Sequence, residues 1–125
     1  MAKAQAWCRQ AGAQLEVTTQ QLEACRSADI VYVKSWGSPA LYGNAAGQTA
    51  SFRDHAQWTV TPRHLGGPQA RLMHCLPVRR NVVIDDAALD DPRCIVVDQA
   101  ENRLWGQVGV LIELLKSAGV RTAVV

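Results

Sequence analysis

Short apolar runs punctuate this chain and predict its strands, and two of them are rich in β-branched residues. Residues 30–33 (Ile-Val-Tyr-Val), 71–75 and 94–97 (Cys-Ile-Val-Val) are three such runs. A run that is apolar on both faces is typical of a strand covered by helices on both sides. Residues 14–18 alternate polar and apolar side chains, which predicts a further short strand.

The segments between these runs favour helices. Residues 2–11 are strong helix formers that stop at Gly12, and residues 20–27 follow Thr19, a good capping residue. Strands that alternate with helices predict an α/β fold, a three-layer Rossmann-like domain with a parallel sheet. Because the chain opens on a helix where such a sheet usually begins with a strand, we expect the sheet to be incomplete at its amino-terminal edge.

Asp98 and Glu101 resemble a capping box, and residues 85–90 predict a small helix. The helix expected after Asp98 carries an apolar stripe at helical spacing, formed by Leu104, Val108, Leu111, Ile112 and Leu115. Residues 35–53 are small and polar and predict a long loop, which inside a domain of this size is usually functional.

Thr61 and Pro62 predict the capping residue and first position of a short helical turn. His55 and His64 lie in polar surroundings, so we expect both at the surface. Trp7, Trp58 and Trp105 are expected in the core or at an interface.

Length and composition exclude several classes of protein. The 125 residues suit one domain, and 48% hydrophobic with 19% charged residues is ordinary for a globular protein. A net charge of +2 does not indicate a nucleic-acid or polybasic membrane surface. The sequence contains neither a membrane-spanning apolar run nor a recognisable signal peptide, so we expect a cytoplasmic protein.

The four cysteines are expected to be reduced, because they form no C-x-x-C pair and a cytosolic protein rarely keeps disulfides. Cys8, Cys25 and Cys94 read as small core residues. A zinc site at His74 and Cys75 would need partners distant in the sequence, so no metal is predicted. The absence of a Gly-x-Gly-x-x-Gly or Walker motif argues against a nucleotide cofactor, and none is expected.

Candidate chemistry lies where the predicted strands end, because ligands of parallel sheets collect outside the carboxyl ends of the strands. Residues 34–36 (Lys-Ser-Trp), 74–81 (His-Cys-Leu-Pro-Val-Arg-Arg-Asn) and 98–103 (Asp-Gln-Ala-Glu-Asn-Arg) stand at three such ends. Their cationic side chains favour an anion with phosphate or carboxylate groups. Each segment also has a structural interpretation: a solvated lysine, a packed His-Cys pair, or an Arg103 that only pairs with Glu101 or Asp98.

The order of residues 73–81 and 98–104 resembles the amino-acid-binding domain of the ornithine carbamoyltransferase family, and the similarity runs from Lys3 to about Ala118. The sequence is most similar to N-acetylornithine and N-succinylornithine carbamoyltransferases. Complete members are more than twice as long and trimeric, so the resemblance implies that residues 1–125 are a partial ornithine-binding domain without the carbamoyl-phosphate domain. It also implies a homo-oligomer, or association with a carbamoyl-phosphate domain.

The resemblance implies roles for individual residues. His74, Cys75, Leu76 and Arg103 would bind carbamoyl phosphate, with Arg103 holding the oxygens on which charge develops. The acylornithine would contact residues at the ends of two strands, namely Lys34, Ser35, Trp36, Cys75, Leu76 and Arg79. Cys75 would line the pocket and would not act as a nucleophile, because the amine itself attacks.

Charge at position 34 suggests the acceptor. Enzymes that use free ornithine have an Asp-x-Trp segment here, with the aspartate near the α-ammonium, whereas this chain has Lys34-Ser35-Trp36. A lysine repels an α-ammonium but not an acylated nitrogen. Val83 stands where some N-acetylornithine enzymes have a lysine, and Trp105 replaces an expected histidine.

The resemblance therefore implies a carbamoyltransferase that converts carbamoyl phosphate and an N-acylornithine to N-acylcitrulline and phosphate in arginine biosynthesis. The alternatives are an ornithine carbamoyltransferase acting on free ornithine, and a non-catalytic module that binds an amino acid or a protein partner. A flavodoxin-like domain unrelated to carbamoyl transfer is a third interpretation. Neither nucleic acid nor membrane is expected as a partner.

Overall fold

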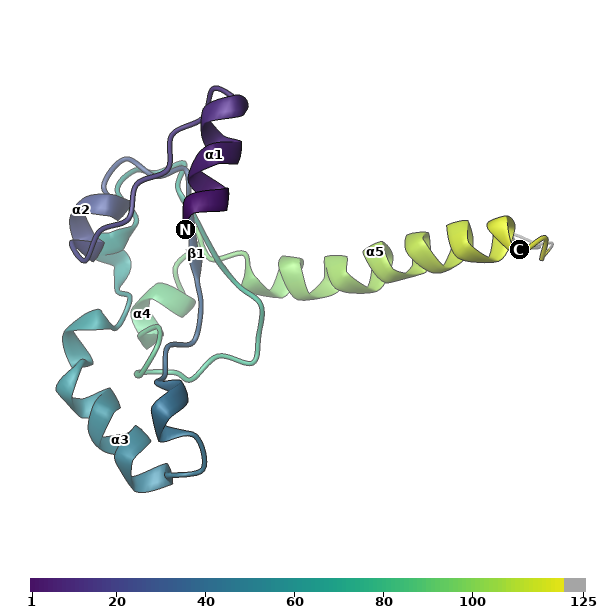
Figure 1. The fold of residues 1–125 in the computed structure, drawn as a ribbon. Helices are drawn as coiled ribbons and strands as arrows, with labels where there is room; N and C mark the ends of the chain where they lie inside the picture. The colour runs from purple at the N-terminus through teal and green to yellow at the C-terminus, as the bar shows by residue number, and fades with distance from the viewer. Residues whose placement is uncertain (121–125) are drawn as a thin grey trace.

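The structure is a computed structural model that describes residues 1–120, in which helices and two strands alternate along the chain (Figure 1). The helices are α1 (Ala2–Gln10), α2 (Gln21–Cys25), α3 (Ala45–Asp54), α4 (Asp86–Leu89) and α5 (Val96–Ser117). The strands are β1 (Ile30–Val33) and β2 (Arg71–His74), and the short 3-10 helices are η1 (Pro39–Leu41), η2 (Ala56–Trp58) and η3 (Pro62–His64).

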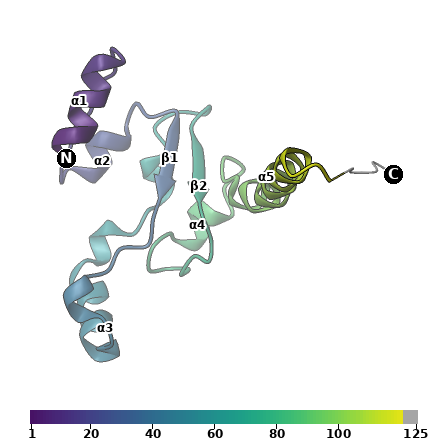
Figure 2. The same cartoon turned by 45° about the vertical axis from the view of Figure 1, so that its right-hand side comes forward.

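The two strands form a parallel sheet, with Ile30 paired to Arg71 and Val33 paired to His74. Figure 2 shows the strands side by side, with α1, α2 and α3 on one side and α4 and α5 on the other. The predicted α/β class with a parallel sheet is confirmed. Within residues 1–120 β1 pairs only with β2, and its Ile30 and Tyr32 side chains are exposed.

The predicted strand at 94–97 is wrong beyond its first residue. Cys94 makes a single parallel bridge to Leu72, and α5 begins at Val96. The amide of Ile95 donates to the Leu72 carbonyl (2.9 Å), and the chain then turns into the helix. Val96 is buried in the first turn of α5 while Val97 is exposed, and an apolar run at the start of such a helix has the same composition as a short strand.

The predicted start of the last helix at Asp98 is also wrong. α5 has Ile95 as its N-terminal cap and no capping side chain, so the predicted capping box of Asp98 and Glu101 is wrong. Asp98 lies within the first turn, where its negative charge complements the helix dipole. At α2 the cap is Gln20 rather than Thr19.

Two further predictions from local pattern are wrong. Residues 14–18 form no strand and are exposed; their alternation finds no neighbouring strand to pair with among the described residues. The predicted loop at 35–53 contains η1 and most of α3, which begins where the Asn44 side chain accepts a hydrogen bond from the Gly47 amide (2.9 Å). An asparagine at this position is a strong helix start that outweighs the glycines around it.

The core lies between β2 and the segment before α4. Leu72 and Ile84 are fully buried, and Val31, Val33, Val60 and Val83 pack with them.

The predicted turn at Thr61-Pro62 is confirmed as η3, as is the small helix α4. His64 was expected at the surface but is buried, because its Nδ1 accepts the Thr61 amide (3.0 Å) and closes this turn. His55 is exposed as expected.

Helix α5 runs away from the rest of the chain (Figure 1). Gln99 of α5 contacts β1, because its Nε2 donates to the Tyr32 hydroxyl (3.0 Å). Most of the apolar side chains of α5 are exposed. Trp7, Trp58 and Trp105 are also exposed, so none of the three belongs to the core of residues 1–120. None of the described helices combines the length and apolarity that crossing a bilayer requires.

Candidate functional site

The ends of β1 and β2 meet and bring two predicted segments together. Because Val33 pairs with His74, the next residues, Lys34 and Cys75, leave the sheet side by side. The Lys34 ammonium donates a hydrogen bond to the Cys75 sulfur at 3.3 Å. The expectation that these two strand ends share one edge of the sheet is confirmed.

A cavity of about 630 Å³ opens at this edge. All six residues expected to contact the acylornithine line it, namely Lys34, Ser35, Trp36, Cys75, Leu76 and Arg79. The buried Val83 closes one part of the wall, and Phe52 and Gln48 of α3 close another. That these residues bind a substrate stays a prediction.

The cavity is positively charged. Lys34 and Arg79 line it, and no aspartate or glutamate does so among the residues that the structure describes. The Arg79 guanidinium carbon lies 4.9 Å from the centre of the Phe52 ring, and Trp36 packs edge-on against the same ring at 5.0 Å. A cation over an aromatic face is attracted by the ring's quadrupole, so Phe52 orients Arg79 without neutralising it. The arrangement therefore suits an anionic ligand.

His74 supports this edge from inside and is not part of the cavity wall. It is almost fully buried, and its Nδ1 accepts the Leu76 amide at 2.9 Å. Burial, and then the nearby Lys34 charge, lower the pKa of His74 below its ordinary value. The ring is therefore neutral at pH 7 with its proton on Nε2, which has no partner among the described residues.

The turn after β2 has an unusual backbone. Leu76 adopts a left-handed conformation (φ 46°) and its peptide bond to Pro77 is cis. A non-glycine residue persists in this region only where the surroundings fix it. Here the bond from the Leu76 amide to His74 does so, and the turn carries residues 76–79 across the end of the sheet.

Arg103 lies apart from the other predicted residues. It is exposed on α5 and does not line the cavity, and α5 as a whole runs away from the rest of the chain (Figure 1). Nothing in residues 1–120 tests the predicted contact between Arg103 and carbamoyl phosphate, which stays a prediction.

The contribution of α3 was missed from the sequence, since residues 35–53 read as a loop. Helix α3 supplies Phe52, the only phenylalanine of the chain, and Arg53. The signal that could have revealed it is Asn44, a strong capping residue followed by ten residues without proline.

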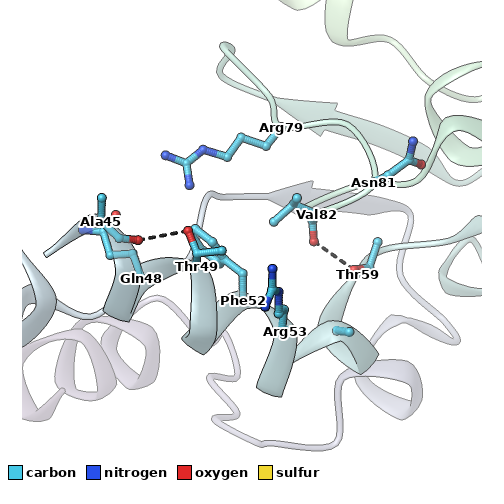
Figure 3. A pocket seen from close by; sticks show the side chains of 10 residues that line it. Ala45, Gln48, Thr49, Phe52, Arg53, Thr59, Arg79, Asn81 and Val82 are labelled. Carbon is cyan, nitrogen blue, oxygen red and sulfur yellow. Dashed lines mark hydrogen bonds between the residues drawn. The ribbon is translucent and has the colours of Figure 1, made fainter.

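A second cavity, of about 560 Å³, shares Arg79 with the first, and Figure 3 shows the side chains that line this second cavity. Figure 3 shows the Arg79 side chain opposite α3, which presents Gln48, Thr49, Phe52 and Arg53. Gln48, Phe52 and Arg79 line both cavities.

The described residues contain no cluster of three or more His, Cys, Asp or Glu side chains that could hold a metal ion. The zinc alternative at His74 and Cys75 therefore has no support in this part of the chain. The four cysteines, Cys8, Cys25, Cys75 and Cys94, are all free thiols.

Comparisons with known proteins agree with this geometry. Residues 1–114 match the family model described as "Aspartate/ornithine carbamoyltransferase, Asp/Orn binding domain". The N-acetylornithine carbamoyltransferase of Xanthomonas axonopodis pv. citri is 36% identical over 112 residues, which are 89% of this chain and 33% of that protein. The putrescine carbamoyltransferase of Mycoplasma mycoides subsp. mycoides SC is 37% identical over 107 residues, 86% of this chain and 29% of that protein.

A solved structure of a variant N-acetyl-L-ornithine transcarbamylase complexed with PALAO superimposes with a TM-score of 0.68 at 36% identity, over 83% of this chain and 32% of that one. An ornithine carbamoyltransferase of Methanosarcina acetivorans is also similar, at 34% identity over 84% of this chain and 34% of that protein. The chain thus spans about a third of the length of the curated relatives it matches. By its sequence match and its fold, the chain belongs to the aspartate/ornithine carbamoyltransferase family and corresponds to its Asp/Orn-binding domain.

Proposed function

We propose that this chain forms the acceptor site of a carbamoyltransferase that transfers the carbamoyl group of carbamoyl phosphate to the side-chain amine of an N-acylated ornithine. One observation carries the choice of acceptor: the cavity at the strand ends presents Lys34 and Arg79 and, among the described residues, no carboxylate. Such a wall attracts the α-carboxylate of an amino acid and has no acidic partner for an α-ammonium.

The strength of the charge repulsion at Lys34 decides which acceptor the cavity favours. Two unit charges about 4 Å apart interact by about 4 kcal/mol at an effective dielectric constant near 20. Free ornithine would bring an α-ammonium next to Lys34, and putrescine would bring two ammonium groups and no carboxylate. Acylation removes the α-ammonium and keeps the carboxylate, so an N-acylornithine gains attraction without the repulsion.

The reaction needs a donor site as well. The neutral side-chain amine attacks the carbonyl carbon of carbamoyl phosphate; the new C–N bond forms, the C–O bond to phosphate breaks, and the departing phosphate takes up the proton that the amine loses. The backbone carbonyls of His74, Cys75 and Leu76 would accept hydrogen bonds from the carbamoyl NH2 group. Arg103 would stabilise the oxygen on which negative charge develops, a contribution that is often several kcal/mol.

The proposal includes partners and location. We propose that the chain works with a carbamoyl-phosphate-binding domain, in a trimer, in the cytoplasm and in arginine biosynthesis. Because Arg103 stands outside the cavity, a partner that approaches α5 would bring the donor next to this arginine.

A chimeric enzyme tests the acceptor. The matching third of the Xanthomonas axonopodis pv. citri relative is replaced by this chain, and kcat/KM is measured with carbamoyl phosphate and four acceptors: N-acetylornithine, N-succinylornithine, ornithine and putrescine. We expect at least one acylated acceptor to be preferred over ornithine and putrescine by about tenfold or more.

A preference for ornithine or putrescine would contradict the proposal. An inactive chimera, combined with binding of acylornithine by the chain itself, would favour the non-catalytic amino-acid-binding module.

A further inference from the structure

The second cavity has a chemistry of its own. It lies between α3 and residues 79–82, and its apolar wall includes Ala45, Phe52 and Val82 (Figure 3). Two guanidinium groups, those of Arg53 and Arg79, also line it, and no acidic side chain of residues 1–120 does. An apolar channel with cations on its wall suits a short aliphatic chain that ends in an anion.

The neutral donors of this cavity already have partners. The hydroxyl groups of Thr49 and Thr59 donate to the carbonyls of Ala45 (2.9 Å) and Val82 (2.8 Å), as the dashed lines in Figure 3 mark. The side-chain amide of Gln48 donates to the Leu41 carbonyl (3.2 Å), and that of Asn81 donates to the Asp86 carboxylate (2.9 Å).

The two arginines differ from these donors. Neither Arg53 nor Arg79 makes a side-chain hydrogen bond or an ion pair within residues 1–120; Arg79 makes only its contact with the Phe52 ring. Some other arginines of the described residues are paired, for example Arg80 with Asp86 and Asp90, and Arg93 with Asp91, so Arg53 and Arg79 are distinguished by lining this cavity and not by lacking partners alone. Guanidinium groups without a protein acceptor are the available anion-binding groups here.

The two cavities are arranged in series. Arg79 and Phe52 stand between them and line both, so a ligand anchored near Lys34 reaches the second cavity by passing this pair. We infer that the acyl group of the acceptor is a dicarboxylic acyl group of the succinyl class, whose terminal carboxylate binds Arg53 and Arg79 while Lys34 holds the α-carboxylate. The inference rests on the proposed function and deepens it, because it identifies the acyl group.

This assignment accounts for the number of cations. An N-acetyl group has no charge to place beyond Arg79 and would leave Arg53 without a ligand. A succinyl group adds one carboxylate, and the fork of an arginine is well suited to bind it. The acceptor then carries two carboxylates for the three cations along the two cavities.

Titration calorimetry with the full 125-residue chain tests the inference. The ligands are N-succinylornithine, N-acetylornithine, ornithine and N-succinamoylornithine, in which an amide replaces the terminal carboxylate. We expect the succinyl compound to bind about tenfold tighter than the acetyl and succinamoyl compounds. Free succinate, added as a competitor, is expected to bind more weakly than N-succinylornithine, because it lacks the anchor at Lys34.

Arg53→Gln is expected to remove this advantage and to change the Kd of N-acetylornithine by less than about twofold. Arg53 is exposed, so its replacement does not disturb the core. The matched control is Arg9→Gln, which removes the same charge from an exposed site on α1 and lines neither cavity.

The outcomes separate the two proposals. Equal affinity for the succinyl and acetyl compounds, both tighter than ornithine, would overturn the dicarboxylic acyl group and leave the proposed function standing. An Arg53→Gln variant that weakens both compounds equally, or neither, would overturn it in the same way. Tightest binding of ornithine, or binding of none of the ligands, would overturn both.

Discussion

The ammonium nitrogen of Lys34 lies 3.3 Å from the sulfur of Cys75, across the two strands of the sheet. Each residue is the first one after its strand, so the contact exists because β1 and β2 are parallel and in register. This contact holds the lysine at the edge of the cavity, where it contributes positive charge to the wall.

Reversal of the charge at position 34 should change the preferred acceptor. In the chimeric enzyme, Lys34→Asp is expected to shift the ratio of kcat/KM for ornithine over N-acetylornithine by about tenfold or more toward ornithine, because the aspartate would attract the α-ammonium. Lys34→Met, which removes the charge without reversing it, is the matched control and should lie between the two. An unchanged ratio in Lys34→Asp would contradict the charge argument.

Replacement of the Cys75 thiol should have a small effect on the reaction. Cys75→Ser keeps a group that can accept the hydrogen bond from Lys34, and the attacking group is the amine of the acceptor, so we expect kcat to fall by less than about tenfold. Cys8→Ser, at a half-buried position of α1 that lines neither of the two cavities, is the control. A loss of about a thousandfold or more would instead indicate that the sulfur is a nucleophile.

Removal of the guanidinium at position 103 should separate binding from catalysis. Arg103→Gln is expected to lower kcat of the chimera by about a hundredfold or more, the usual effect of losing one donor to a developing oxyanion. The Kd of the acceptor for the 125-residue chain should stay the same, because Arg103 does not line its cavity. Lys116→Gln on the same helix is the control for charge, and a weaker acceptor affinity in Arg103→Gln would contradict the assignment.

The stability of the fold should depend on pH through His74. Burial lowers the pKa of His74, so in mildly acidic solution the unfolded chain binds a proton at this residue that the folded chain does not. Because of His74, the free energy of unfolding is therefore at its full value above the ordinary histidine pKa of about 6.5. It decreases as the pH falls below that pKa.

Urea unfolding between about pH 5 and pH 8 measures how the free energy of unfolding depends on pH. This range extends about one to two pH units below and above the ordinary histidine pKa. His74→Asn keeps an acceptor for the Leu76 amide and should flatten the pH dependence, whereas His55→Gln controls for the loss of an exposed histidine. An equally steep dependence in His74→Asn would show that another group is responsible.

Loss of packing at the centre of the sheet should be costly. Leu72→Ala opens a cavity at a fully buried position and should lower the free energy of unfolding by about 2–5 kcal/mol. Leu114→Ala, on the exposed part of α5, removes the same atoms and should change it by about 0.5 kcal/mol or less. Equal effects in the two variants would mean that the core is not centred on β2.

The parts of the fold that depend on local composition could be predicted from the sequence. The runs at Ile30–Val33 and Arg71–His74 form strands as predicted, although only alternate side chains of β1 are buried, and the strand ends carry Lys34 and Cys75 as expected. The similarity to carbamoyltransferases rested partly on residues 73–81, at the end of β2, and partly on residues 98–104, which lie within α5 and not at a strand end.

The rest depends on contacts between distant segments. The apolar residues 94–97 suit a strand or a buried helix start, and the hydrogen bonds of Leu72 to residues 93 and 95 determine which one forms. Phe52 and Arg53 join the site because α3 folds back over the turn after β2, and no spacing in the sequence reveals that contact. His64 is buried although its neighbours in the sequence are polar, because a hydrogen bond within its own turn satisfies its ring nitrogen.

The pairing of Val33 with His74 makes the cavity sensitive to strand length. Side chains alternate between the two faces of a strand, so one residue inserted between Val33 and Lys34 would turn the ammonium away from Cys75. Two inserted residues would restore the face and move the charge by about 7 Å along the strand direction. Relatives that differ in length within β1 or β2 would accordingly need a different cation at this edge of the sheet.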